Sequence, residues 1–169
     1  RYLKKRGGCE VKYTVSTSLG KFTLSLFPED APVTVKNFSE YVEEKFYNET
    51  IFHRVIDGFM IQGGGFNKNL EEKSTKESIK NEANNGLSNK ALTIAMARTS
   101  DPHSASSQFF INLVDNLFLD FTEETSDGWG YAVFGEVTDG QETIFKIGKV
   151  QTGTRGFFQD VPVKPIEIQ

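Results

Sequence analysis

Arg54 is the residue whose setting most favours a chemical role. It lies between Phe52 and Val55, in a segment whose apolar residues are typical of a strand. An arginine in such a strand needs either a buried partner of opposite charge or a cleft that solvent can enter. We favour the cleft, and a buried pair with Asp or Glu is the alternative. The sequence therefore makes Arg54 the first candidate for a functional cation.

The two histidines form no recognisable motif. His53 and His103 lack a metal-ligand spacing such as HxxxH, and we assign neither to catalysis. The serines that follow His103, at positions 104, 106 and 107, lack the GxSxG turn of serine hydrolases. We expect these serines to lie in a loop. A peptide hydrolase that uses His103 and a nearby serine is a third-ranked hypothesis, and it predicts cleaved peptide.

Glycines and acidic residues also fit structural roles better than chemical ones. Gly63, Gly64 and Gly65 are not followed by the Lys-Ser/Thr pair or the spaced glycine of a nucleotide site. We expect them to let the backbone bend away from a pocket. Glu123, Glu124 and the mixed charges of residues 71–80 are typical of solvated loops. The sequence predicts no metal, no cofactor and no paired-carboxylate catalysis.

The elements that must position Arg54 begin with a hairpin and a helix. Residues 11–16 and 22–26 alternate apolar and polar side chains on either side of Leu19-Gly20, which predicts two antiparallel strands. A helix is predicted from Pro32, because apolar residues recur after it at three- and four-residue spacing. These apolar positions are Val35, Phe38, Tyr41, Val42 and Phe46.

Most of the remaining chain reads as strands and loops. Residues 52–62 predict two short strands separated by Asp57-Gly58, with Arg54 on the first. Residues 67–90 are polar and predict a long surface loop of the kind that is often functional. Further strands are predicted at 93–97, 108–113 and 131–137, a second helix at 141–147, and a closing strand at 165–168 after a turn at 161–163. We expect one domain over residues 1–169, with residues 1–10 as a flexible extension.

Composition narrows the classes of function. The net charge of −4, with no basic run after the first six residues, argues against nucleic acid as a partner. A single cysteine, Cys9, cannot form an intrachain disulfide, and no apolar run has the length needed to cross a membrane. Because the 15 phenylalanines need a packed interior or a pocket, we expect some of them to line a site.

Three dense segments carry a resemblance to a known family. They are FHRVIDGFMIQGGGF at residues 52–66, TIAMARTSDPHSASSQFFIN at 93–112 and NLFLD at 116–120. The strings APVTVKNF, YAVFGEV and QDVPVKP extend the match over nearly the whole chain. Together they resemble the cyclophilins, and GWGYAVFGEV and IKNEANNGL look closer to bacterial members than to the animal cytosolic form. The resemblance implies an all-β dominated fold, a closed eight-stranded antiparallel β-barrel capped by two α-helices.

The resemblance also assigns roles to residues of this chain. The family's catalytic arginine corresponds to Arg54. Its backbone-pairing segment falls on Ala97 and Arg98, where a cation replaces a neutral side chain. Its pocket and rim fall on Phe59, Met60, Gln62, Gln108, Phe110, Phe118, Leu119 and Tyr131.

Two of these positions depart from the family pattern. Phe118 stands where the family has a rim tryptophan, and Tyr131 stands where it has a pocket histidine. Without the indole N–H at position 118, we expect cyclosporin, an inhibitor known to bind this family, to bind more weakly than it does to members with tryptophan.

The activity that the resemblance implies is peptidyl-prolyl cis/trans isomerisation, without a cofactor. We expect Arg54 to stabilise the twisted, pyramidal prolyl nitrogen beside an apolar pocket, and the partners to be proline-containing peptides and folding chains. The alternative is a module that binds proline segments or unfolded chains without turning them over. We also expect a monomer in the bacterial cytoplasm. The periplasm is the alternative, since a leader could have preceded Arg1.

Overall fold

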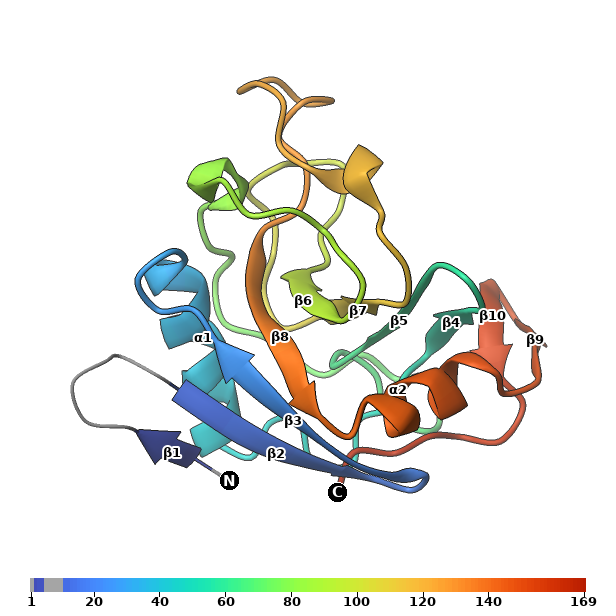
Figure 1. The fold of residues 1–169 in the computed structure, drawn as a ribbon. Coiled ribbons are helices and arrows are strands. Elements are labelled where there is room, and N and C mark those ends of the chain that lie inside the picture. The colour runs from blue at the N-terminus through green and yellow to red at the C-terminus, as the bar shows by residue number, and fades with distance from the viewer. Residues whose placement is uncertain (1, 5–10) are drawn as a thin grey trace.

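The computed structural model describes residues 2–4 and 11–169 of the chain, and its regular elements are mostly strands (Figure 1). Residues 1–10 were expected to form a flexible extension. Of these, Tyr2–Lys4 form strand β1, whereas residues 1 and 5–10, Cys9 included, lie outside the described residues. The strands are β1 Tyr2–Lys4, β2 Val11–Thr17, β3 Gly20–Leu26, β4 Arg54–Ile56, β5 Met60–Gly63, β6 Thr93–Met96, β7 Phe109–Asn112, β8 Val133–Asp139, β9 Thr152–Arg155 and β10 Phe158–Pro162. The helices are α1 Pro32–Glu43 and α2 Gln141–Gly148, with 3-10 turns η1 Ala83–Asn85 and η2 Leu117–Leu119.

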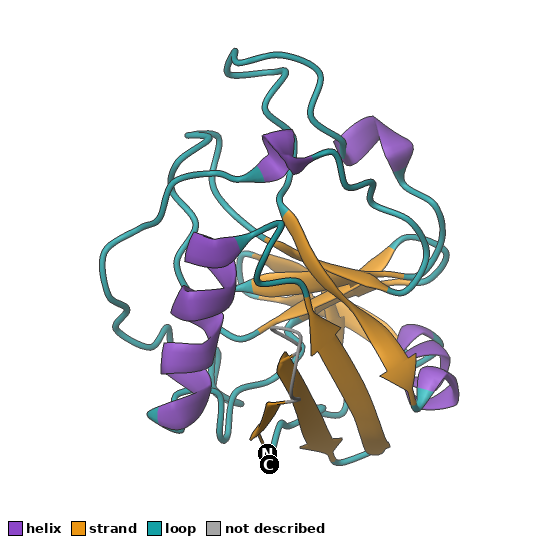
Figure 2. Ribbon diagram, turned by 60° about the vertical axis from the view of Figure 1, so that its left-hand side comes forward, coloured by secondary structure: helices purple, strands orange, loops and turns teal. Residues whose placement is uncertain are grey.

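The main sheet is antiparallel throughout and strongly curled (Figure 2). Its strand order is β1-β2-β3-β8-β6-β7-β5-β4. The C-terminal segment connects the two sides of this sheet, because Ile168 forms a bridge with Thr17 at the end of β2 and Glu167 forms one with Ile51 just before β4. The predicted mostly-β class, with a curled antiparallel sheet and two helices, is confirmed. The closure consists of single bridges rather than a continuous ladder.

Each helix packs against the interior of the curled sheet. Pro32 begins α1, where its missing N–H does no harm, and Val35, Phe38 and Tyr41 are buried. From α2, Ile144 and Ile147 are fully buried in the same apolar cluster. The three- and four-residue spacing seen in the sequence therefore marks the side of α1 that covers the sheet.

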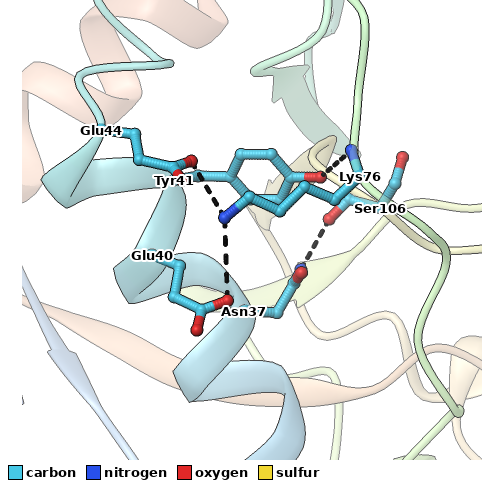
Figure 3. A network of polar contacts seen from close by, with 6 residues as sticks. All are labelled: Asn37, Glu40, Tyr41, Glu44, Lys76 and Ser106. Atoms are coloured by element: carbon cyan, nitrogen blue, oxygen red, sulfur yellow. Dashed lines mark hydrogen bonds and ion pairs between the residues drawn. The ribbon is translucent and has the colours of Figure 1, made fainter.

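The polar loop predicted at residues 67–90 runs across α1 and is fastened to it. Near the start of the helix, Thr34 donates from its backbone N–H (2.7 Å) and its hydroxyl (2.6 Å) to Glu82 Oε1. Near its end, the Lys76 backbone N–H donates to the Tyr41 hydroxyl (3.0 Å), and Lys76 Nζ lies 2.9 Å from Glu44 Oε2 (Figure 3). The loop is thus anchored along the helix.

Strand register brings the functional candidates into one row. Residues on a strand alternate between its two faces, and in this sheet Arg54 pairs with Gln62, Gln62 with Phe110 and Phe110 with Ala95. The residues between them, including Val55, Ile61 and Phe109, join the larger apolar cluster with the helices. We call the side of the larger cluster the core face and the opposite side, which carries Arg54, the pocket face.

The C-terminal region differs from the sequence prediction. Residues 161–163 were expected to form a turn before a closing strand at 165–168. Instead, Val161 and Pro162 end strand β10, which pairs with β9 in a separate hairpin, and residues 167 and 168 form only isolated bridges. Most side chains of β9 are exposed, so this strand has no alternating apolar pattern to reveal it. Pro162 is tolerated because a two-stranded sheet leaves each strand with a free edge.

Among the described residues, no helix combines the length and the apolar character needed to cross a membrane.

Candidate functional site

A small pocket on the pocket face gathers most of the predicted site residues. Its volume is about 80 Å³. The residues that line it come from strands β4, β5 and β7 and from the turn between β4 and β5. Others come from η2, from the segment that follows β6 and from the segment that precedes β8. They are Arg54, Phe59, Met60, Ala97, Arg98, Phe110, Leu119 and Tyr131. We call this the pocket-face pocket. Gln62, Gln108 and Phe118, the other three predicted residues, stand beside it.

Arg54 opens onto this pocket. Its side chain is exposed, and none of the ion pairs between described residues involves it. Arg54 Nη1 donates to Gln62 Oε1 over 3.4 Å, a long contact that leaves most of the five guanidinium N–H groups available. The cleft interpretation of the sequence is therefore the one that the structure supports, and the alternative of a buried ion pair is wrong.

Gln62 and Gln108 extend the polar side of the site. Gln62 Nε2 donates to Gln108 Oε1 (3.0 Å), so the two amides and Arg54 form one chain of hydrogen bonds. Gly65 makes room for it, because a Cβ there would lie 2.5 Å from Gln108 Cγ. Gly64 has a φ of +89°, and a Cβ would lie 2.7 Å from a ring carbon of Phe109. Gly65 thus serves close packing beside the pocket, and Gly64 serves it on the core face.

The apolar side of the pocket consists of buried and half-buried side chains. Met60 and Phe110 are buried, and the Phe110 ring meets Tyr131 edge to face at 5.7 Å. Phe118 is 75% exposed and stacks on Phe59, with ring centroids 5.9 Å apart. Phe118 therefore enlarges the apolar rim without closing the pocket.

Arg98, the cation at a position where the family has a neutral side chain, has its guanidinium held in place. Its Nε and Nη2 both donate to the Gly130 carbonyl, at 3.1 and 2.8 Å, and Nη1 donates to the Thr99 carbonyl at 2.9 Å. Its Cζ lies 4.4 Å from the Tyr131 ring centroid, a cation–π contact. Arg98 therefore braces Tyr131 and the backbone beside it.

A buried network of asparagines supports the same pocket, and sequence reasoning did not find it. Asn116 Nδ2 donates to the Phe59 carbonyl (3.0 Å) and to Asn112 Oδ1 (2.9 Å). Asn112 in turn donates to Asn89 Oδ1 (3.1 Å). The three asparagines are at most 3% exposed.

From Asn89 the network reaches the far side of the pocket. Asn89 Nδ2 lies within hydrogen-bonding distance of the Leu119 and Tyr131 carbonyls, both at 3.3 Å. The network thus ties the backbone of three pocket residues, Phe59, Leu119 and Tyr131. An asparagine at the end of the apolar run FFIN was the available signal, because a polar side chain there must be satisfied.

The histidines stay outside the pocket. His53 is 5% exposed, and burial together with the charge of Arg54 lowers its pKa from 6.5 to about 4. His103 Nδ1 accepts from the Asn81 backbone N–H (3.0 Å), and its ring packs edge to face on Trp129. Within residues 2–4 and 11–169, no three His, Cys, Asp or Glu side chains come together as a metal site would require.

Comparison with known proteins gives one family. Residues 12–169 match the model described as cyclophilin type peptidyl-prolyl cis-trans isomerase/CLD. Peptidyl-prolyl cis-trans isomerase B of Escherichia coli (strain K12) is 57% identical over 156 residues, which span 92% of this chain and 95% of that protein.

Solved structures agree with the sequence matches. A cyclophilin type peptidyl-prolyl cis-trans isomerase of Cryptosporidium parvum superposes with a TM-score of 0.80 at 26% identity, covering 94% of each chain. The structure of that protein in the presence of the dipeptide Ala-Pro gives a TM-score of 0.77 at 27% identity, covering 92% of this chain and 93% of that one. The chain therefore belongs to the cyclophilin family of peptidyl-prolyl cis-trans isomerases.

Proposed function

We propose that Arg54 is the electrostatic catalyst of isomerisation in this protein. The rotation barrier of about 18–20 kcal/mol arises because the amide nitrogen shares its lone pair with the C–N bond. In the twisted transition state that lone pair is localised on a pyramidal nitrogen. A guanidinium donor directed at the nitrogen binds this state better than the planar one. The observation that carries the proposal is that Arg54 lines the pocket without an ionic partner among the described residues.

The required acceleration is within reach of this arrangement. Uncatalysed exchange takes tens of seconds, so ordinary turnover needs about 10³–10⁵-fold acceleration, or about 4–7 kcal/mol. A hydrogen bond from a charged group contributes about 1.5–3 kcal/mol, and its strength grows where water is excluded. No covalent step is needed.

The remaining site residues divide into a holding group and an orienting group. Met60, Phe110, Leu119 and Phe59 would hold the proline ring against one apolar wall, so that one side of the bond stays fixed. Gln62 and Gln108 would donate amide N–H groups to a substrate carbonyl on the mobile side. Ala97 and Arg98 would pair with the substrate through their backbone, while Phe118 and Tyr131 would form the rim.

We propose proline-containing peptides and folding polypeptides as the substrates. The Cryptosporidium parvum protein was solved in the presence of Ala-Pro, a dipeptide of this class. The pocket's small size and apolar wall fit a five-membered ring better than a long side chain. Family membership and the isomerase relatives favour turnover over a module that only binds proline segments. His103 is not among the residues that line the pocket, which argues against peptide cleavage there.

The test is a protease-coupled assay on an X-Pro peptide with Arg54→Ala. Removing one such donor is expected to lower kcat/KM by about 10²–10³-fold, with peptide binding largely kept. Arg155→Ala is the matched control, because Arg155 is also exposed but donates to the Lys68 carbonyl and is absent from the pocket lining. Equal rates for the wild type and Arg54→Ala would reject Arg54 as the catalyst.

Inhibitor binding gives a separate test of the rim. We propose that cyclosporin binds weakly, because Phe118 offers an exposed ring without an N–H donor. Phe118→Trp should restore a donor at the rim and tighten binding in a titration. An unchanged affinity would remove Phe118 as the cause.

The remaining sequence predictions are proposals with direct tests. We propose one domain and a monomer, for which light scattering should give a mass near 19.0 kDa. The net charge of −4 supports the absence of a nucleic-acid partner, which a titration with duplex DNA at low salt would test. We propose the bacterial cytoplasm as the compartment, and fractionation of the native host would distinguish it from the periplasm.

A further inference from the structure

A second and larger cavity lies on the core face of the sheet. Its volume is about 280 Å³, and α1, β2, β3, the segment after α1, β7 and the C-terminal segment contribute to its lining. We call it the α1–β2 cavity. It shares no lining residue with the pocket-face pocket. Because buried and exposed residues both line it, the cavity leads from the surface to the apolar interior and is open to a small molecule from solvent.

The floor of the cavity is apolar and aromatic. Leu24, Phe38 and Phe109 are at most 3% exposed, and the Phe38 ring meets the rings of Tyr47 (5.1 Å) and Phe109 (5.7 Å). The Tyr47 hydroxyl donates to the Ser107 carbonyl (2.8 Å), which fixes the orientation of its ring. The floor is therefore preformed, as the sites of small molecules usually are.

The rim of the cavity carries a cation. Lys45 is exposed at the rim, and none of the ion pairs between described residues involves it. It lies two residues after the end of α1 and has a φ of +59°, a conformation that glycine or asparagine adopts more readily. Asn48, also exposed, adds an amide to the same rim. The rim therefore offers a positive charge and N–H donors above an apolar floor.

We propose that the α1–β2 cavity binds a small amphiphile, a compact aryl or branched alkyl group that carries one carboxylate. The apolar part would rest on the ring of Phe109 and its neighbours, and the carboxylate would meet Lys45 and Asn48. A cavity of about 150 Å³ in another protein binds benzene, so this volume suffices for a phenyl ring with a short tail. The site is independent of isomerisation, because consecutive residues Phe109 and Phe110 line the two different spaces.

The probe for this site is 4-phenylbutyrate, added to the full chain and followed by NMR. Nuclear Overhauser effects are expected between the phenyl ring and the methyl groups of Leu24 and Val42, with a dissociation constant of roughly 0.1–1 mM. A saturating X-Pro peptide should not displace the probe. Effects at Met60 and Leu119 instead, or displacement by the peptide, would overturn the proposal. Neither result depends on whether Arg54 is the catalyst.

Variants that fill the cavity provide the second readout. Val42→Phe and Val15→Phe place a ring into the space from α1 and from β2, and each should lower the affinity at least tenfold. Val33→Phe is the matched control, because Val33 lies on the same helix but is 46% exposed and outside the cavity lining. It should bind the probe as the wild type does. Unchanged binding in both filling variants would reject the site.

The charge of Lys45 is tested separately. Lys45→Asn removes the cation and places at this position a residue suited to a positive φ, so a folding defect is not expected. It should bind 4-phenylbutyrate about two- to fivefold more weakly, the scale of an exposed ion pair. The neutral probe 4-phenylbutanol should bind wild type and Lys45→Asn equally. Equal affinity of the wild type for the acid and the alcohol would contradict the carboxylate assignment.

Discussion

Phe109 and Phe110 are consecutive residues of β7 with nearly the same exposure, 3% and 4%, yet their surroundings differ. Phe109 points to the core face and meets three aromatic rings, those of Phe38, Tyr47 and Phe52, at edge-to-face angles. Phe110 belongs to a smaller cluster on the pocket face and meets Tyr131. One strand thus serves two differently built faces of the sheet.

The contrast lies in what supports the rings. On the core face, aromatic and aliphatic side chains from the sheet and both helices support one another. On the pocket face, the smaller cluster is backed by hydrogen bonds from Asn89, Asn112 and Asn116, and by the guanidinium of Arg98 on the Gly130 carbonyl. Such directional bonds can hold a rim in place while leaving it open. The core face therefore contributes most of the stability and the pocket face most of the binding geometry.

The largest effect should separate Phe109 from Phe110. Phe109→Ala is expected to lower the free energy of unfolding by about 3–5 kcal/mol, because the surrounding rings cannot fill the space. Phe110→Ala should lower it less, since Phe110 belongs to the smaller cluster and meets one aromatic ring edge to face where Phe109 meets three, but should raise KM for an X-Pro peptide. Urea denaturation and the coupled assay measure the two effects.

One outcome would contradict the separation of the core face from the pocket face. If Phe109→Ala raised KM as much as Phe110→Ala at a temperature where both are folded, the faces would not be functionally separate. Phe109→Leu and Phe110→Leu, which keep most of the side-chain volume, should show the same division with smaller effects.

The next effect is a pH dependence of stability that centres on His53. Its pKa is lowered from 6.5 to about 4, first by burial and then by the charge of Arg54. The unfolded chain therefore binds a proton that the folded chain does not, so stability is complete above about pH 6.5 and falls as the pH is lowered to about 4. A shift of this size corresponds to about 3 kcal/mol. Urea denaturation between pH 4 and pH 7 should record it.

Control variants distinguish the contribution of His53 to this pH dependence from that of the carboxylates that titrate in the same range. His53→Gln should remove about 3 kcal/mol of the loss between pH 6.5 and pH 4, while His103→Gln should keep it. Arg54→Ala should move the pKa of His53 upward in an NMR titration, because it removes a neighbouring positive charge. The same pH profile in wild type and His53→Gln would contradict the assignment.

Local patterns predicted most of the fold. The hairpin around Leu19-Gly20, the helix from Pro32 and the break at Asp57-Gly58 all lie within a few residues of the observed elements. Each has a strong periodic or turn signal. The β9–β10 hairpin was missed because β9 is largely exposed on both faces, and closure through Ile168 depends on pairing between distant segments that no local pattern records.

The site was predicted less from physics than from resemblance. Arg54 was found by its charge in an apolar strand, whereas the pocket residues Met60 and Phe110 look like ordinary core residues in the sequence. Only the register of β4, β5 and β7 shows that they share a face with Arg54. The α1–β2 cavity joins segments far apart in the chain and had no local signal. The asparagine network had one, Asn112 at the end of FFIN, but nothing local indicates that its partners are Asn89 and Asn116.

A smaller effect should come from the asparagines that support the pocket face. Asn112→Leu keeps the branched shape of the side chain but removes the donor to Asn89 Oδ1 and one of the two acceptors of Asn116 Nδ2 in a buried position. The expected loss of stability is about 1–3 kcal/mol, with KM raised severalfold because Asn116, which holds the Phe59 carbonyl, is then less firmly oriented. Asn84→Leu is the control, since Asn84 is exposed. A stability loss without any change in KM would make the network purely structural.

The smallest effect should come from the charges that fasten the polar loop to α1. Lys76 Nζ lies 2.9 Å from Glu44 and 3.7 Å from Glu40 on the surface, and these carboxylates raise the pKa of Lys76 (Figure 3). Lys76→Met should reduce the melting temperature only slightly, and the difference should vanish in high salt because exposed charges are screened. Tyr41→Phe should destabilise more and independently of salt, because the Lys76 N–H then loses its acceptor. A large loss in Lys76→Met that high salt removes would mean that the core face depends on surface charge as well as on packing.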